Sequence, residues 1–274
     1  MIFKGKTVIV TGASEGVGAA AARKFAHAGA NLMLVARSKK NLDAIAEELR
    51  DISRVEIFAM DVSDAEICVD LFKKTEFEFG RIDVLVNNAG CHARGLVDEV
   101  PAEDLGRMID VNLRAPIILT RLALPYLREA GGGAIINVAS IAGRTPVPGS
   151  TTYSASKFGL RIFTFALAEE LHGTNIRVAA LSPGPIDTGF IMADIDNTPP
   201  MTFSQPMSTA DEVAQAILDL CGNKQRELAM PRISGVLSTL GYLLPWLWRV
   251  LRPSLERKGE RAKKALKAKQ KAEG

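Results

Sequence analysis

The sequence predicts an α/β protein with one doubly wound, parallel sheet covered by helices on both faces. Apolar, β-branched runs alternate with longer helix-forming stretches through most of the chain, which is the order expected of strand–helix–strand units. The apolar runs are continuous rather than alternating, as in strands that are buried on both sides. A Gly-rich turn also joins the first apolar run to the first helix-forming stretch. We therefore expect a single domain in residues 1–232 and a helical extension in residues 233–274.

Six short apolar runs are expected to be strands, because each is rich in Val, Ile or Leu. In chain order they are Thr7–Val10, Asn31–Ala36, Val55–Met60, Ile82–Val86, Ala134–Val138 and Ile176–Leu181. The stretches between them have helical periodicity. The expected helices are Ala19–Ala28, Lys40–Arg50, Glu66–Phe79, Ala102–Glu129, Thr152–Leu171 and Asp211–Leu220. The longest irregular segment, Pro183–Met207, is rich in proline and apolar residues, and loops of that length are usually functional or mobile.

The composition argues against several classes of function. The net charge of +3 comes from the end of the chain, because Glu256–Gly274 holds eight Lys or Arg and three Glu. The body therefore lacks a general nucleic-acid-binding character. Three widely spaced cysteines fit neither a disulfide framework nor a zinc site, and no His/Cys/carboxylate cluster suggests a metal. Reduced thiols, and a first strand that leaves no room for a signal peptide, predict a cytoplasmic protein.

The turn at Thr11–Gly18 is the first candidate binding site. Its spacing is G-x-x-x-G-x-G rather than the common G-x-G-x-x-G. Glycines between a strand and a helix let the backbone approach a pyrophosphate, which the helix N-terminus attracts. We expect a Rossmann-like dinucleotide site that includes Gly12, Ser14, Gly16, Val17 and Gly18.

Arg37 lies at the end of the second strand, where a carboxylate would bind the ribose 2′-hydroxyl of NAD(H). A guanidinium suits a 2′-phosphate by charge and by bidentate geometry, so we expect NADP(H) in preference to NAD(H). The alternative is that Arg37 only solvates the start of a helix. Asp61 and Val62, which end the third strand, are placed where adenine would lie. A helix N-cap at Asp61 or Ser63 would explain them nearly as well.

Tyr153 and Lys157 are the candidates for proton transfer. Four residues apart on a helix, they lie on one face, one turn from each other. A phenol titrates near pH ~10 in water, and a nearby ammonium favours the phenolate and lowers that pKa. The pattern Y-x-x-x-K is common by chance, so its meaning depends on the motifs around it.

Together these motifs resemble those of the short-chain dehydrogenase/reductase family, over roughly residues 5 to 230. The matching pieces are Thr11–Gly18, Asn87–Gly90, Asn112, Ser140, Tyr153 with Lys157, and Pro183–Gly184, in the family's order. The resemblance implies that Ser140 polarises a substrate carbonyl and that Tyr153 is the general acid or base. It implies that Lys157 lowers the tyrosine pKa and holds the nicotinamide ribose, and that Asn112 positions a water for proton relay. It further implies cofactor contacts from Asn88, Ala89, Gly90, Pro183, Gly184, Ile186 and Thr188.

Two features differ from the family pattern. Glu15 stands in the Gly-rich turn where many NADP-using members have a basic residue, which weakens the preference for NADP(H) without reversing it. The usual C-terminal end, a strand followed by a Gly-rich closing segment, is expected to be missing. Instead, Glu227–Met230 leads into Pro231 and a different extension.

The extension has a helical stripe within Val236–Leu251, formed by Leu237, Leu240, Leu244, Leu247 and Leu251. Pro245 is expected to kink it. Nearby aromatic and basic residues suit an interface with anionic lipid, which predicts peripheral membrane contact through residues 236–274; they are Trp246, Trp248, Arg249 and Arg252. The alternative is that the stripe packs over the substrate pocket or against a partner subunit, and that the Lys/Ala-rich tail is a solvated helix or disordered. We favour a helix over the pocket that also touches membrane.

The expected function is therefore an NADP(H)-dependent oxidoreductase that interconverts an alcohol and a ketone on a hydrophobic or lipid-like substrate. The alternative is a catalytically silent NADP(H)-binding sensor or scaffold. By resemblance, the long helices Ala102–Glu129 and Thr152–Leu171 imply a homo-oligomer. Among the histidines, His92 is expected to border the active site, but a loop histidine without a partner is a poor catalytic candidate.

Overall fold

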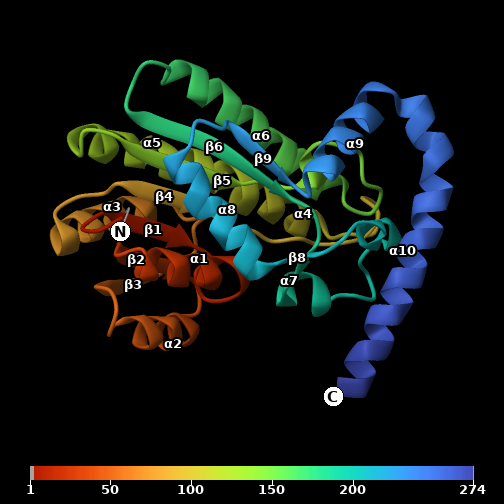
Figure 1. The fold of residues 1–274 in the computed structure, drawn as a ribbon, viewed down its shortest axis with the longest axis horizontal. Coiled ribbons are helices and arrows are strands. Elements are labelled where there is room, and N and C mark those ends of the chain that lie inside the picture. Colours follow the sequence, from red (N-terminus) through yellow and green to blue (C-terminus); the bar gives the residue numbers. More distant parts are fainter. Residues whose placement is uncertain (1–2, 274) are drawn as a thin grey trace.

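The computed structural model describes residues 3–273, apart from the side chains of residues 247–248 and 269–273. Its centre is a seven-stranded sheet in which every neighbouring pair is parallel, in the order β3-β2-β1-β4-β5-β6-β9 (Figure 1). The strands are β1 (Thr7–Thr11), β2 (Asn31–Ala36), β3 (Val55–Ala59), β4 (Val84–Asn87), β5 (Gly133–Val138), β6 (Ile176–Pro183) and β9 (Glu227–Met230). The doubly wound parallel sheet that the sequence predicts is confirmed.

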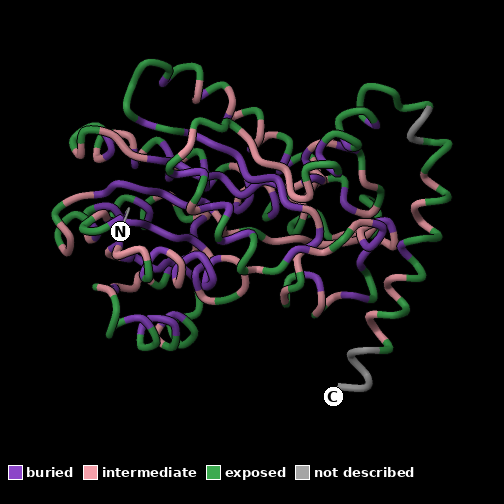
Figure 2. The backbone as a smooth tube through the Cα atoms, in the orientation of Figure 1, coloured by how far each residue is buried: buried purple, intermediate pink, exposed green. Residues whose placement is uncertain are grey.

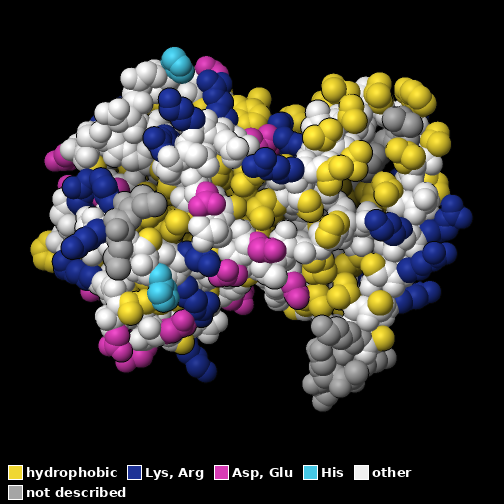
Figure 3. All heavy atoms as spheres, viewed as in Figure 1, with side chains coloured by type: hydrophobic (Ala, Val, Ile, Leu, Met, Phe, Trp, Pro, Cys, Tyr) yellow, Lys and Arg dark blue, Asp and Glu magenta, His cyan; other side chains and the backbone are white. Residues whose placement is uncertain are grey.

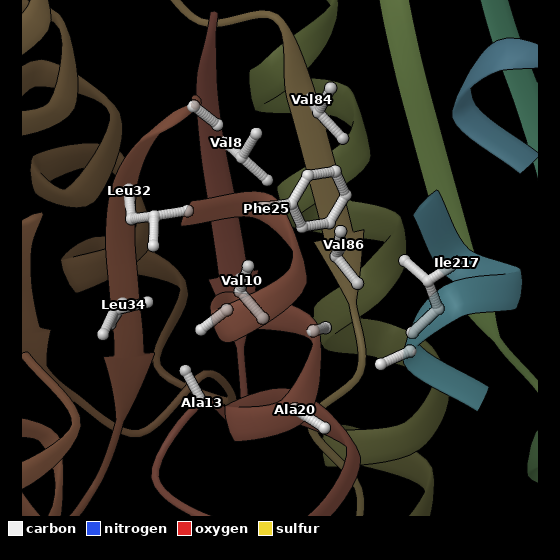
Figure 4. Close-up of a cluster of buried hydrophobic side chains, with 14 of the residues drawn as sticks. Val8, Val10, Ala13, Ala20, Phe25, Leu32, Leu34, Val84, Val86 and Ile217 are labelled. Carbon is white, nitrogen blue, oxygen red and sulfur yellow. The ribbon is translucent and has the colours of Figure 1, made fainter. Parts of the chain in front are cut away.

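Successive side chains of a strand point to opposite faces of the sheet, so two apolar clusters form. On one face, Val8 and Val10 share a cluster with Phe25 and Ile217 (Figure 4). This face is covered by α1 (Gly16–His27), α2 (Lys39–Leu49) and α8 (Ala210–Gly222). On the other face, Ile9 lies in a second cluster with residues of α3 (Ala65–Phe79), α5 (Ala115–Glu129) and α6 (Thr151–Glu170). Figure 2 shows the buried residues following the strands between these layers.

The long helix expected at Ala102–Glu129 is interrupted. It consists of α4 (Ala102–Ile109), a single π-helical stretch η1 (Asp110–Arg114), and α5. The π turn carries Asn112, whose side chain is fully buried. Such bulges often mark functional sites because they turn one side chain out of the regular helical register.

Strand order reverses between β1 and β4, which defines the crevice at the carboxyl ends of the strands where α/β proteins bind ligands. The segment expected to be an irregular loop, Pro183–Met207, covers this crevice and contains short elements. They are β7 (Ile186–Asp187), α7 (Gly189–Met192) and η3 (Pro200–Ser204); β7 pairs with β8 (Ser208–Thr209), just beyond the segment, in a second small sheet. We call residues 186–207 the lid.

The C-terminal end corrects one expectation. The closing strand is present as β9, which pairs in parallel with β6 and completes the sheet. Its first residue, Glu227, accepts hydrogen bonds from Arg144 and Arg161, at 2.9 and 2.8 Å, which explains a carboxylate at this edge. The difference from the family pattern lies after this strand. Helices α9 (Arg232–Leu243) and α10 (Pro245–Glu273) stand there in place of a Gly-rich segment.

The prediction of a helical extension is also confirmed, and Pro245 begins a second helix where a kink was expected. Helix α10 runs along the lid (Figure 1). Gly259 permits the close approach, because a Cβ there would lie 1.8 Å from the Pro200 carbonyl oxygen. The side chains of Leu247 and Trp248 lie outside the described residues. Among the described helices, none has the length and apolar character that crossing a bilayer requires.

Candidate active site

A cavity of about 1280 Å³ opens at the carboxyl ends of the strands. Seventeen residues singled out from the sequence line it: Gly12, Ser14, Gly16, Val17, Arg37, Asp61, Val62, Asn88, Ala89, Gly90, Ser140, Tyr153, Lys157, Pro183, Gly184, Ile186 and Thr188. Gly18 and Asn112 are not among the lining residues and lie behind the wall. The lid and the inner faces of α9 and α10 complete the cavity, through residues such as Ile191, Met201, Leu237 and Leu255. The extension thus borders the pocket, but of the predicted leucine stripe only Leu237 lines it, and the described leucines of the stripe are all exposed.

The Gly-rich turn fits a pyrophosphate. Gly12 and Gly16 have φ of +66° and +53°, a backbone conformation that residues with a Cβ atom rarely adopt. The N-cap residue of α1, Glu15, makes no side-chain cap, so the first N–H groups of the helix remain available to an anion. Gly18 lets α1 pack directly on the turn, since a Cβ there would lie 2.0 Å from the Gly12 carbonyl oxygen.

Asn88 clamps the same turn from the neighbouring strand. Its Nδ2 donates to the carbonyl oxygens of Thr11 and Gly12, at 2.9 and 3.3 Å. The Thr11 hydroxyl in turn accepts from the backbone N–H groups of Asn88 and Ala89, at 2.9 and 3.0 Å. The Asn87–Gly90 motif therefore fixes the shape of the turn, in addition to forming part of the cavity wall.

At the far end of the cavity, Arg37 is exposed at the lip, and in the described part of the chain it has no ion-pair or hydrogen-bond partner. Beside it, helix α2 begins, with Ser38 accepting from the Asn41 N–H at its N-cap. Both the guanidinium and the helix N-terminus favour an anion here.

The environment of Asp61 corrects a second expectation, because Asp64 and not Asp61 or Ser63 caps α3. The Asp61 carboxylate accepts from the Ser63 backbone N–H and hydroxyl, and pairs with Arg107 at 2.7 Å. Burial disfavours its ionised form, but these hydrogen bonds outweigh burial and lower the pKa of Asp61 to about 2. The carboxylate is thus a fixed negative part of the cavity wall.

Ser140, Tyr153 and Lys157 meet where β5 and α6 approach each other. The Ser140 hydroxyl faces the Tyr153 phenol and favours its ionised form, which opposes the effect of burial on the pKa of Tyr153. Lys157 Nζ donates to the Val138 carbonyl oxygen at 2.8 Å and lies 5.8 Å from the centre of the Tyr153 ring. Burial lowers the pKa of Lys157 to about 8.

The expected effect of Lys157 on the tyrosine is not seen in this arrangement. Burial raises the pKa of Tyr153, and the groups that oppose the increase are the Ser140 hydroxyl and the charge of Arg94. The reason is geometric, because the ammonium is directed at a backbone carbonyl. A shift of the Lys157 side chain toward the cavity would be needed to bring its charge to the phenol.

Asn112 is buried beneath the cavity wall, and its side chain forms hydrogen bonds within the protein. Its Oδ1 accepts from the Cys91 N–H, and its Nδ2 donates to the Cys91 carbonyl oxygen, each at 2.9 Å. Nδ2 also lies 3.2 Å from the Ser156 hydroxyl. Asn112 therefore ties the loop after β4 to α6, and its expected role in a water relay stays a prediction.

His92, which was expected to border the site without a catalytic role, and Arg94, which the sequence did not indicate, lie at the tyrosine. The His92 ring stacks on Tyr153, with centroids 4.1 Å apart and planes 16° from parallel. Arg94 joins the lid, where it pairs with Asp194 at 2.7 Å and donates to the Phe190 carbonyl oxygen at 2.9 Å. The one sequence signal for both was their position just after the Asn87–Gly90 turn.

We expect His92 to make the fold acid-sensitive. Burial, with the charge of Arg94, lowers its pKa from 6.5 to about 3, so the native state stays neutral where the unfolded chain takes up a proton. The unfolded state therefore binds more protons between these pH values, and stability is lost as pH falls through this window. Between about pH 6.5 and about pH 4.5 the loss is about 2–3 kcal/mol.

Urea unfolding at those two pH values measures this loss. His92→Phe keeps an aromatic ring against Tyr153 and should lose most of the pH dependence, while the exposed-site control His172→Gln should retain it. Equal slopes in all three proteins would contradict the assignment to His92.

The cavity joins a dinucleotide-sized cleft to a tyrosine, a serine and a lysine, which is the arrangement of a nicotinamide-dependent oxidoreductase. Residues 6–198 match the family model described as short chain dehydrogenase. The chain therefore belongs to the short-chain dehydrogenase/reductase family of oxidoreductases.

Relatives and solved structures agree with this placement. The chain is 35% identical over 233 residues to 3-oxoacyl-(acyl-carrier-protein) reductase FabG of Thermotoga maritima, a match that covers 82% of this chain and 93% of that protein. It is 40% identical over 187 residues to sulfoacetaldehyde reductase 2 of Chromohalobacter salexigens, covering 68% and 74%. The crystal structure of levodione reductase superposes with a TM-score of 0.77 at 26% sequence identity, covering 86% of this chain and 98% of that one.

Proposed function

We propose that the protein is an NADP(H)-dependent oxidoreductase that interconverts an alcohol and a ketone on a hydrophobic substrate. The observation that carries this proposal is the placement of Ser140, Tyr153 and Lys157 in one cavity with the Gly-rich turn. When bound, the cofactor supplies or accepts the hydride. Ser140 polarises the substrate carbonyl, Tyr153 donates a proton to its oxygen during reduction or accepts one during oxidation, and Lys157 holds the nicotinamide ribose.

The preference for NADP(H) rests on the lip of the cavity. Arg37 is free to pair with a 2′-phosphate, and the N-terminus of α2 adds a partial positive charge. Glu15 lines the same cleft and opposes a phosphate. Arg23 also lines it, but its Nε and Nη2 donate to the two carboxylate oxygens of Glu48, at 2.7 Å each, so its charge is already paired. Arg37 is thus the cation on which the preference depends.

Arg37→Glu should reverse the coenzyme preference. Loss of a charge-assisted bidentate contact, and its replacement by a repulsive carboxylate, should raise the KM for NADPH by about ten- to a hundredfold. The KM for NADH should change little or fall, since a carboxylate can accept from the ribose 2′-hydroxyl. Steady-state kinetics with both coenzymes measure the ratio. A parallel loss with NADPH and NADH would instead indicate a damaged fold.

A hydrophobic substrate is favoured by the part of the cavity beyond the tyrosine. Apolar side chains from the lid and from both C-terminal helices line it, among them Ile191, Met201, Ile233, Leu237 and Leu255. The similarity to the Thermotoga 3-oxoacyl-(acyl-carrier-protein) reductase supports a ketone with an acyl chain. The name of the structural neighbour, levodione reductase, supports a ketone more generally.

The test is oxidation of NADPH and NADH by the purified protein, with long-chain 3-oxoacyl, steroid and small polar ketones as substrates. Turnover of lipid ketones with NADPH supports the proposal, while faster turnover of small polar ketones would exclude a lipid-like substrate. Tyr153→Phe distinguishes the alternative of a silent sensor. Such a sensor would bind NADPH, show no turnover, and keep its cellular role in this variant.

Homo-oligomer formation and a cytoplasmic location are further parts of the proposal. The helices by which family members associate correspond here to α5 and α6, and these expose Ile117, Phe158 and Ile162. Light scattering on the purified protein measures the oligomeric state. The membrane contact predicted for residues 236–274 is a separate property, because it concerns the outer face of α9 and α10.

A further inference from the structure

Exposed apolar side chains are concentrated at one corner of the molecule. Among the described residues, half of the exposed large hydrophobic side chains lie between Ile233 and Leu251. Figure 3 shows them gathered over α9 and the beginning of α10. We define the apolar tip by the five that are at least 60% exposed, which are Ile233, Val236, Leu243, Trp246 and Val250. Soluble surfaces rarely leave so many large apolar side chains together without a partner.

A basic band follows the apolar tip along α10. The face of α10 toward the lid carries Gly259, Ala262 and Leu266, and the opposite face carries Arg257, Arg261 and Lys264 at the same spacing. These three, with Arg249 beside the tip, form the basic band, and all four are exposed. In the described part of the chain none of the four has an ion-pair partner. The band therefore attracts an anionic partner.

The tip and the band hold fixed positions on the fold. Lys263 Nζ, on the lid side of α10, donates to the carbonyl oxygens of Asp196 and Thr198, at 2.8 Å each. Gly259 brings the same helix against Pro200. At the other end, the Arg144 guanidinium donates to the Gly235 carbonyl oxygen in α9 at 2.7 Å. The apolar tip is thus presented by a helical hairpin that is fixed at both ends.

We propose that the apolar tip and the basic band form a docking surface for an anionic lipid bilayer, with the tip inserted at the interface and the band against the headgroups. Exposed Trp next to Arg and Lys, on a helix with separate apolar and basic regions, has the chemistry of interfacial binding. A second copy of this chain fits less well, because it could cover the apolar tip but offers the same positive charge, and no anionic partner, to the basic band. Nucleic acid would leave the tip uncovered.

The surface also adjoins the cavity. Ile233, which is a residue of the tip, and Leu237, one turn further along α9, both line the cavity. Lys258 lines the cavity from α10. Docking therefore places the apolar part of the cavity next to the lipid, whatever reaction the cavity performs.

Flotation of the full chain with vesicles tests the proposal. Vesicles of equal parts phosphatidylcholine and phosphatidylglycerol should carry the protein, less so as salt is added, and pure phosphatidylcholine should carry much less. Trp246→Glu with Val250→Glu should weaken binding by about a hundredfold, because two exposed apolar groups become charged. Arg257→Glu with Lys264→Glu should weaken it by at least about tenfold.

Phe77→Glu is the matched control, since Phe77 is 86% exposed on α3, away from the tip, and its substitution should leave binding unchanged. Thermal unfolding verifies that all variants are folded. No flotation of the wild type, or the same loss in Phe77→Glu as in the tip variant, would overturn the proposal. A third outcome would also overturn it: the wild type does not bind vesicles, and light scattering shows that the tip variant has a different oligomeric state. That result would assign the tip to contact with a second copy.

Discussion

Tyr153→Phe should lower kcat for ketone reduction by about 10²–10⁴-fold, because the phenol is the group placed to exchange a proton with the substrate oxygen. Phenylalanine keeps the ring that stacks on His92 at 4.1 Å, so the cavity wall should retain its shape. It removes the hydroxyl on which Ser140 acts. The loss should therefore appear in kcat, with the dissociation constant of NADPH almost unchanged.

Single-turnover kinetics with NADPH, together with cofactor binding followed by fluorescence, separate the two quantities. Tyr126→Phe is the matched control, because Tyr126 stacks on Phe72 in the helical layer of α3 and α5, remote from the cavity. That variant should keep full activity. If Tyr153→Phe retained more than about a tenth of wild-type kcat, the proton would have to come from another group, and the proposed mechanism would fail.

The central strands were predictable from the sequence because they are buried on both faces, so their side chains are continuously apolar. The last strand, β9, was not recognised as part of the sheet. It has four residues, begins with Glu227, and pairs with β6 alone, so local pattern carries little of its signal. Its position is determined by tertiary contacts, above all the hydrogen bonds of Glu227 with Arg144 and Arg161.

The candidate site divides in the same way. Residues that act through a local motif, such as Gly12 in its turn or Lys157 one helical turn from Tyr153, follow from spacing. His92 and Arg94 depend on contacts with segments far along the chain, since Arg94 pairs with Asp194 a hundred residues later. The pKa of Tyr153 shows the limit most clearly. Spacing predicted the neighbouring ammonium, but its hydrogen bond to the Val138 carbonyl depends on the packing of α6 against β5 and cannot be predicted from spacing.

Gly18→Ala should damage both fold and cofactor binding, although alanine is the better helix former. Gly18 has no positive φ, so the backbone itself would accept alanine. The added Cβ, however, would lie 2.0 Å from the Gly12 carbonyl oxygen and 2.7 Å from Asn88 Nδ2. Neither atom can move away easily, because the Asn88 side chain is hydrogen-bonded to the carbonyl oxygens of Thr11 and Gly12. We expect a loss of about 3 kcal/mol in the free energy of unfolding.

Cofactor affinity should fall with it by about a hundredfold, because the displaced turn is the segment that approaches the pyrophosphate. Gly106→Ala is the matched control, as Gly106 lies within α4 with nothing within 4 Å of an added Cβ. Helix propensity alone acts there, and stability should rise by about 0.5–1 kcal/mol. Chemical unfolding and NADPH titration of the two variants thus separate the effect of the steric contact at Gly18 from the effect of helix propensity. If both substitutions proved stabilising, the close packing of α1 on the turn would be refuted, and with it the geometry assigned to the cofactor site.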